Sequence, residues 1–158
     1  MNRKEIKDFI FLVTGKCYPF RFMRHNGNYN NALDFIMKSL LDDKEVLAAA
    51  ISKVFSHTVE DCILINKEKW IKHSLCFKKC VILHELGHIH DPNKRKKAIY
   101  KSELFATTWA IKKAKQLKMY YLASLVTRNL NRWGYYKYNS NARPYLLAHR
   151  LAKKQGII

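Results

Sequence analysis

The sequence predicts a helix-dominated α+β fold with a small β-sheet and additional helices towards the C-terminus. Apolar residues recur at helical spacing through most of the chain, whereas Cys62 to Ile65 is a continuous apolar run typical of a buried strand. At 158 residues the chain is long enough for one domain with its own hydrophobic core. We therefore expect a single domain that combines a short sheet with several packed helices.

The individual elements follow from periodicity and from the residues that interrupt it. In the N-terminal part we expect a helix from Arg3 to Val13 closed at Gly15, a strand from Cys17 to Met23, a loop from Arg24 to Asn31, and helical segments at Asn31–Leu41 and Lys44–Phe55. In the remainder we expect the Cys62–Ile65 strand, a stretch at Lys69–His90 that holds the HELGH helix and its approach, and helices at Ser102–Lys118, Tyr120–Arg132 and Arg143–Gln155, the last closed at Gly156.

One short motif carries most of the chemistry. His84, Glu85 and His88 form an HExxH pattern within the apolar stretch from Val81 to Asp91. Residues four apart lie on one face of an α-helix, so both imidazoles can bind the same metal ion. Glu85 lies on an adjoining face, where its carboxylate can accept a proton from a metal-bound water. The pattern is typical of a zinc-dependent hydrolase, and the alternative is a surface helix with two exposed histidines.

The residues around the motif support a buried, functional helix. Gly87 lies in the helix interior, where glycine costs about 1 kcal/mol relative to alanine. We expect it where a neighbouring strand or the substrate must approach the backbone. Asp91 precedes Pro92, and this pair predicts the end of the helix because the residue before a proline avoids the helical conformation.

A catalytic zinc ion needs three protein ligands and an open position for water. The nearby candidates for the third ligand are His90, Asp91 and Glu103. His90 lies about 200° around the helix from His88 and points away, and Asp91 lies beyond the predicted helix end. Between residues 104 and 158 the chain has no Asp or Glu, and a third histidine would have to be His149. We therefore predict Glu103 as the third ligand.

Glu103 also begins a helical stretch that suits close packing. Ala106 and Ala110 are small residues four apart, and small residues let one helix approach another closely. We accordingly divide the expected domain into N-terminal helices and a loop in residues 1–60, a zinc core in residues 61–118, and basic, aromatic helices in residues 119–158.

These motifs together resemble the ImmA/IrrE family of metallopeptidases, which are gluzincin-type enzymes. The resemblance rests on the Ile63–Asn66 strand, the HELGH helix and the ExxAxxWA pattern of Glu103–Ala110. Trp109 stands where the family often has Phe, and Ile111–Ala114 replaces the family's usual apolar-Pro segment. The resemblance implies a zincin-like core, Zn²⁺ as cofactor, and a cytoplasmic protease that acts on a repressor or another DNA-bound regulator.

The predicted chemistry is hydrolysis of a peptide bond. Zinc lowers the pKa of its bound water to about 7, and Glu85 would accept the proton and pass it to the leaving amine. A further donor would stabilise the oxyanion. Tyr136 and His149 are our candidates, although the sequence also offers Tyr100, Tyr135 and Tyr138.

The sequence also indicates where in the cell the protein is found. No segment resembles a membrane span, and Phe9–Val13 is too short for a signal core, so we expect a cytoplasmic protein without membrane contact. The cysteines at 17, 62, 76 and 80 are then expected to be reduced thiols. Cys76 and Cys80 precede His84 at spacings of four, but the drift of the helix prevents all of them from sharing one ion with His88. Buried thiols are the expected interpretation.

The net charge of +18 is concentrated in the C-terminal part, where basic residues alternate with aromatic ones. Basic surface with stackable rings is typical of nucleic-acid binding, and an acidic protein is the other partner that this charge would suit. Three functions therefore remain open. They are a zinc endopeptidase acting on a regulatory, DNA-associated protein, a nucleic-acid-binding module with structural zinc, and a phage or mobile-element interaction protein on a peptidase scaffold.

Overall fold

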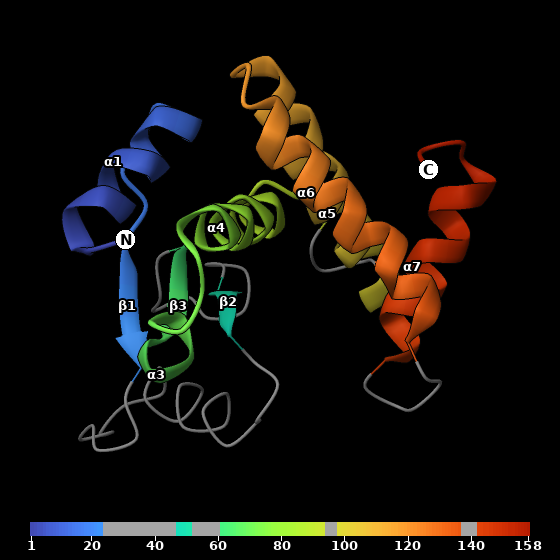
Figure 1. Ribbon diagram of the computed structural model, residues 1–158, viewed down its shortest axis with the longest axis horizontal. Helices are drawn as coiled ribbons and strands as arrows, with labels where there is room; N and C mark the ends of the chain where they lie inside the picture. Colours follow the sequence, from blue (N-terminus) through green and yellow to red (C-terminus); the bar gives the residue numbers. More distant parts are fainter. Residues whose placement is uncertain (24–46, 52–60, 94–97, 137–141) are drawn as a thin grey trace. The chain divides into compact units, whose positions relative to one another are not determined.

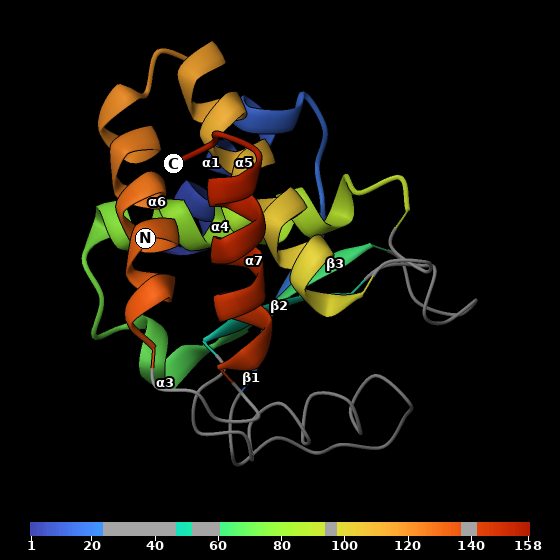
Figure 2. The same cartoon turned by 90° about the vertical axis from the view of Figure 1, so that its right-hand side faces the viewer.

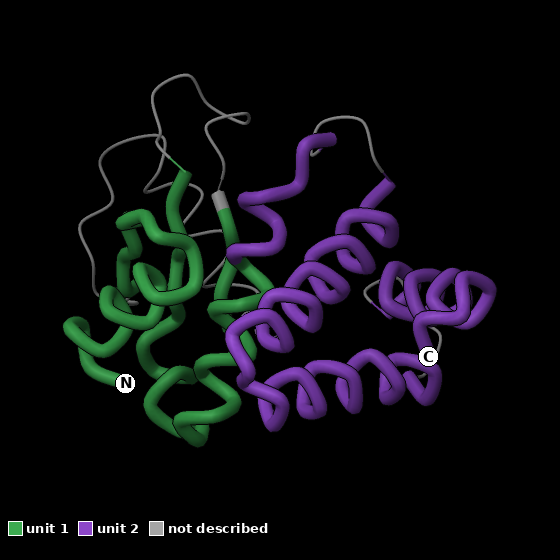
Figure 3. The backbone as a smooth tube through the Cα atoms, turned by 90° about the horizontal axis from the view of Figure 1, so that it is seen from above, with its two compact units in different colours: residues 1–85 green, residues 86–158 purple. Residues whose placement is uncertain are grey.

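The computed structural model describes residues 1–23, 47–51, 61–93, 98–136 and 142–158 (Figure 1). The chain divides into two compact units, residues 1–85 and residues 86–158, and the boundary falls inside one helix (Figure 3). Among the described residues there are six α-helices, one 3₁₀ helix and a three-stranded mixed sheet. This composition confirms the predicted helix-dominated α+β class, whereas the expectation of a single domain stays a prediction.

The first unit begins with α1 (Arg3–Thr14), whose two ends are set by local sequence. Asn2 accepts a hydrogen bond from the backbone N–H of Glu5, and the Glu5 carboxylate accepts one from the N–H of Asn2. This reciprocal capping satisfies backbone donors that a helix start leaves open. At the other end, Gly15 adopts a left-handed φ of 70°, which glycine does without steric cost. The helix buries one apolar face made of Ile6, Phe9, Ile10 and Val13.

The sheet has the strand order β1-β3-β2, with bounds Phe20–Met23, Ala48–Ile51 and Cys62–Asn66 for β1, β2 and β3. The central strand β3 runs parallel to β1, with Phe20 opposite Ile63, and antiparallel to β2, with Ala48 opposite Ile65. All five residues of β3 are buried. A continuous apolar run is expected for a strand covered on both faces, and the predicted strand is confirmed here.

The prediction of helix for Lys44–Phe55 is wrong at Ala48–Ile51, which forms β2. Alanine favours helix by only a few tenths of a kcal/mol per residue, and tertiary pairing overrides a preference of that size. In this chain the edge of β3 supplies the competing partners, as the N–H of Asn66 donates to the carbonyl of Leu47 at 2.9 Å. The loop predicted at 24–31, the helical segment at 31–41 and the remainder of 44–55, except Leu47, lie outside the described residues.

The stretch Lys69–His90, expected to hold the HELGH helix and its approach, covers parts of two helices, α3 (Lys67–Trp70) and α4 (Leu75–Ile89). Two polar side chains explain the interruption. Asn66 caps α3 by accepting from the N–H of Lys69 at 3.2 Å, and the Ser74 hydroxyl accepts from the N–H of Phe77 at 3.3 Å. Each side chain satisfies a donor at a helix start, so the chain begins a new helix after Ser74.

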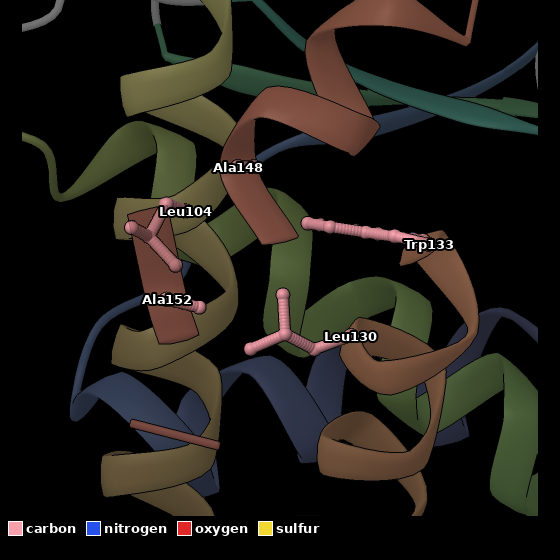
Figure 4. Close-up of a cluster of buried hydrophobic side chains, with 5 residues drawn as sticks. All are labelled: Leu104, Leu130, Trp133, Ala148 and Ala152. Carbon is pink, nitrogen blue, oxygen red and sulfur yellow. The ribbon is translucent and has the colours of Figure 1, made fainter. Parts of the chain in front are cut away.

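The second unit contains α5 (Ile99–Gln116), α6 (Tyr120–Arg132), the 3₁₀ turn η1 (Trp133–Tyr135) and α7 (Arg143–Lys154), and α5 contacts both α6 and α7 (Figure 2). Each predicted helix is present, with ends shifted by a few residues. No helix among the described residues is both long and apolar enough to cross a bilayer. Figure 4 shows the buried cluster that joins these elements: Leu104, Leu130, Trp133, Ala148 and Ala152.

Candidate metal centre

Helix α4 carries the first two candidate ligands. His84 and His88 are one turn apart on this continuous helix, and each side chain is half-buried. The apolar neighbours Ile82, Leu83 and Leu86 are fully buried. Because these neighbours hold one side of α4 in the interior, the two imidazoles occupy the side that remains partly accessible.

Gly87 allows a second helix to approach α4 at this point. A Cβ atom added to Gly87 would lie 2.5 Å from the carbonyl oxygen of Ala106 and 2.7 Å from its Cα. Real Cβ contacts are never that short, so any side chain at position 87 would push α5 away. The sequence led us to expect a strand or the substrate against this glycine, and the neighbour is instead the backbone of α5. The small residue Ala106 lies at the contact itself, as its spacing predicted.

This close approach brings Glu103 to the histidines. Glu103 lies one turn before Ala106 on α5, and its Oε1 is 3.5 Å from Nε2 of His88. One ligand atom from each of His84, His88 and Glu103 lies within 4.8 Å of the others. No other His, Cys, Asp or Glu among the described residues joins this group. The three side chains predicted as ligands are therefore together in the folded chain and could hold a metal ion.

Ser102 is a site residue that the sequence analysis missed. Its hydroxyl oxygen lies 3.1 Å from Nδ1 of His88, so the two ring nitrogens of His88 face different partners. Nδ1 meets Ser102 and Nε2 meets Glu103. A ligating histidine commonly donates its second ring N–H to an oxygen, which selects the tautomer and the ring orientation. The only sequence signal was the position of Ser102 directly before Glu103.

The donor set and its spacing suit a divalent cation of the zinc type. Two imidazole nitrogens and one carboxylate oxygen are the ligands found in many catalytic zinc sites. Two donors about 2.1 Å from a tetrahedral ion lie roughly 3.4 Å apart. The distance of 3.5 Å between Nε2 of His88 and Oε1 of Glu103 is close to this expected separation. Three protein ligands would also leave one coordination position for water.

Glu85 follows His84 directly and does not belong to the ligand group. Its side chain is buried, with 7% of the residue exposed. Next to a metal ligand, such a group is suited to accept and return a proton.

The rejected candidates have other contacts in the structure. The ring of His90 stacks on Trp109 of α5, with centroids 4.9 Å apart and planes 11° apart. Asp91 is fully buried just after α4, and its Oδ1 accepts from the N–H of Asn93 at 2.9 Å. Neither residue joins the ligand group. Asp91 therefore closes the turn that follows α4, in the region where Pro92 was predicted to end the helix.

The candidate oxyanion donors lie among the C-terminal helices. Tyr136 makes an edge-on contact with the ring of Tyr145, at a centroid distance of 6.0 Å. His149 on α7 lies against Gly134 of η1. Burial, with a smaller contribution from the charge of Lys153, lowers the pKa of His149 below its usual value. The oxyanion role of either residue stays a prediction.

The cysteines take no part in the candidate centre. Cys76 and Cys80 on α4 are half-buried, and no cysteine among the described residues belongs to a group able to hold a metal. Burial, assisted by the neighbouring Cys76, raises the pKa of the Cys80 thiol to about 11. Thiolate is the form that binds metals and reacts, so Cys80 stays a protonated thiol at neutral pH.

Comparison of the chain with protein-family models, with curated proteins and with solved structures finds no match. The geometry of the His84, His88 and Glu103 group is therefore the basis for assigning a function.

Proposed function

We propose that this protein is a zinc-dependent peptidase. The observation that carries the proposal is the meeting of His84, His88 and Glu103 from two helices, with the buried carboxylate of Glu85 beside them. Structural zinc sites usually have four protein ligands, whereas catalytic sites have three and keep a position for water. The described part of the chain offers three, which supports a catalytic site.

Each residue has a distinct part in the proposed reaction. His84, His88 and Glu103 bind the ion, and Ser102 holds the ring of His88 by accepting the hydrogen bond from its Nδ1–H. A zinc ion bound there would supply Lewis acidity, which would make the attacking water acidic enough to lose a proton near neutral pH. Glu85 takes one proton from the attacking water and gives it to the leaving amine. The carbonyl carbon gains the hydroxyl group as the C–N bond breaks, so the products are a carboxylic acid and an amine.

The resemblance to the ImmA/IrrE family extends the proposal to the substrate. A regulatory protein that binds DNA is the substrate class that the resemblance implies. The resemblance also implies a cytoplasmic protein, and we propose that location here.

The decisive experiment compares the parent with Glu85→Gln. Glutamine has nearly the same shape as glutamate but cannot accept the proton. We expect both proteins to bind about one zinc ion per chain, measured by elemental analysis after gel filtration. A library of peptides from a digested bacterial proteome would then be incubated with each protein, and new termini would be identified by mass spectrometry.

We expect the parent to produce new termini and Glu85→Gln to lose at least about a hundredfold in rate, which is the lower end of what general acid–base catalysis contributes. Glu68→Gln, an exposed glutamate on α3, serves as the matched control and should cleave like the parent. Equal cleavage by the parent and by zinc-loaded Glu85→Gln would contradict the catalytic assignment.

A further inference from the structure

The second unit contains a surface pocket whose lining includes none of the candidate metal ligands His84, His88 and Glu103. Its volume is about 230 Å³. The lining residues come from the end of α6, from η1 and from α7, and they are Asn131, Gly134, Tyr135, His149 and Lys153. A pocket for a whole drug-sized molecule usually measures at least about 300 Å³. The smaller volume here suits one unit of a longer ligand.

One wall of the pocket depends on a glycine. A Cβ atom added to Gly134 would lie 2.8 Å from both ring nitrogens of His149. The imidazole therefore fills the space that any side chain at position 134 would need, and it lies flat against bare backbone. The lowered pKa of His149 keeps this ring uncharged at neutral pH, so it contributes a polar, flat wall without adding a charge.

The lining of the pocket also includes an exposed aromatic residue and an exposed cation. Tyr135 is 88% exposed, which is far more than a tyrosine needs if it only completes a core. Lys153 and Asn131 are also exposed, and both line the same pocket. A flat apolar ring, an ammonium group and an amide are together the groups that recognise a base and the phosphate next to it.

The segment that lines the pocket carries basic side chains and no acidic ones. Residues 104–158 contain no Asp or Glu, so no carboxylate from this segment competes for the cations. Further exposed arginines and lysines lie on α6 and α7, the helices that supply lining residues. They are Arg128, Arg132, Arg150 and Lys154.

We propose that this pocket binds single-stranded nucleic acid, with a base stacked on Tyr135 and an adjacent phosphate paired with Lys153. A base in a duplex is already stacked between its neighbours, so its face cannot reach Tyr135. An acidic protein could pair with Lys153 but would leave the exposed ring without a flat partner. The inference does not depend on the metal centre, because none of its residues belongs to that group.

The test measures binding of a fluorescein-labelled oligothymidylate of about 16 nucleotides, the upper site size of a compact single-strand binder, by fluorescence anisotropy. A duplex of the same length and polyglutamate are the competing polyanions. We expect the single strand to bind more tightly than either competitor. Tyr135→Ala should weaken binding about fivefold or more, which is the loss that one stacked base implies. Lys153→Ala should weaken binding and reduce the slope of log affinity against log salt by about 0.7.

Matched control variants distinguish binding at the pocket from nonspecific attraction to a positively charged protein. Tyr120→Ala removes another exposed tyrosine from the opposite end of α6, and Lys115→Ala removes an exposed lysine from α5. Both should bind the oligonucleotide within twofold of the parent, or about 0.4 kcal/mol. Circular dichroism would check that all four variants remain folded. Equal losses in pocket and control variants, equal binding of the duplex, or preference for polyglutamate would each overturn the proposal.

Discussion

Nε2 of His88 lies 3.5 Å from Oε1 of Glu103, and these two atoms come from different helices. The two side chains come close because α4 and α5 are in contact one turn after Glu103 on α5, where the backbone of Ala106 packs against Gly87. The same stretch of α5 places Ser102 against the other nitrogen of His88. Ligand geometry and helix packing are therefore linked.

Glu103→Gln is expected to weaken zinc binding by more than the 10- to 100-fold that loss of a supporting hydrogen bond typically costs. An amide oxygen is neutral and donates less electron density to a cation than a carboxylate does. Competition with a chromophoric chelator would measure the affinity. Glu68→Gln removes the same charge from an exposed position of α3 and should bind zinc like the parent. Unchanged affinity in Glu103→Gln would remove Glu103 from the ligand set.

Ser102→Ala is expected to lower zinc affinity by roughly tenfold, because His88 loses the oxygen that orients its ring. Ser102→Thr keeps the hydroxyl and should restore most of the affinity, which a purely structural role of the side chain would not predict. Ser124→Ala on α6 removes an exposed helical serine away from His88 and is the control. The same chelator competition applies. If Ser102→Ala and Ser124→Ala bound zinc equally well, the hydrogen bond at Nδ1 would have no role in binding.

Gly87→Ala is expected to destabilise the fold by roughly 1–3 kcal/mol, the typical cost of overpacking, although alanine favours helix by about 1 kcal/mol. The added Cβ would meet the carbonyl oxygen and Cα of Ala106, which are backbone atoms. Adding Ala106→Gly should therefore give no rescue, since trimming a side chain does not move backbone. Urea unfolding would measure both variants. A double variant as stable as the parent would show that the contact is made by side chains.

Removal of metal is expected to lower the melting temperature of the parent. An ion present at a thousandfold excess over its Kd stabilises the folded state by about 4 kcal/mol. In a chain of this size that corresponds to roughly 10 °C. Calorimetry with zinc and with excess chelator would measure the shift. His84→Ala with His88→Ala should melt at one temperature under both conditions, and an equal shift in that double variant would place the ion elsewhere.

Much of the site could be predicted from local sequence. The spacing of His84 and His88 puts two imidazoles on one helix face whatever the rest of the chain does, because the helical repeat is a local property. The apolar run of β3 and the breaks at Gly15 and Gly156 are equally local, and each is confirmed. The choice of Glu103 rested on the scarcity of acidic residues after it, and its position beside His88 agrees with that choice.

Other features depended on partners far along the chain. Ala48–Ile51 has a composition that suits helix, and it is a strand because β3 offers it a row of backbone hydrogen bonds. Ser102 carries no motif of its own, and only the packing of α5 on α4 brings it to His88. The pocket lined by Tyr135 and Lys153 likewise exists only because two helices and a turn pack together. Residue spacing determines which side chains lie together on one face of a helix. Contacts between separate elements depend instead on burial and backbone pairing across the whole chain.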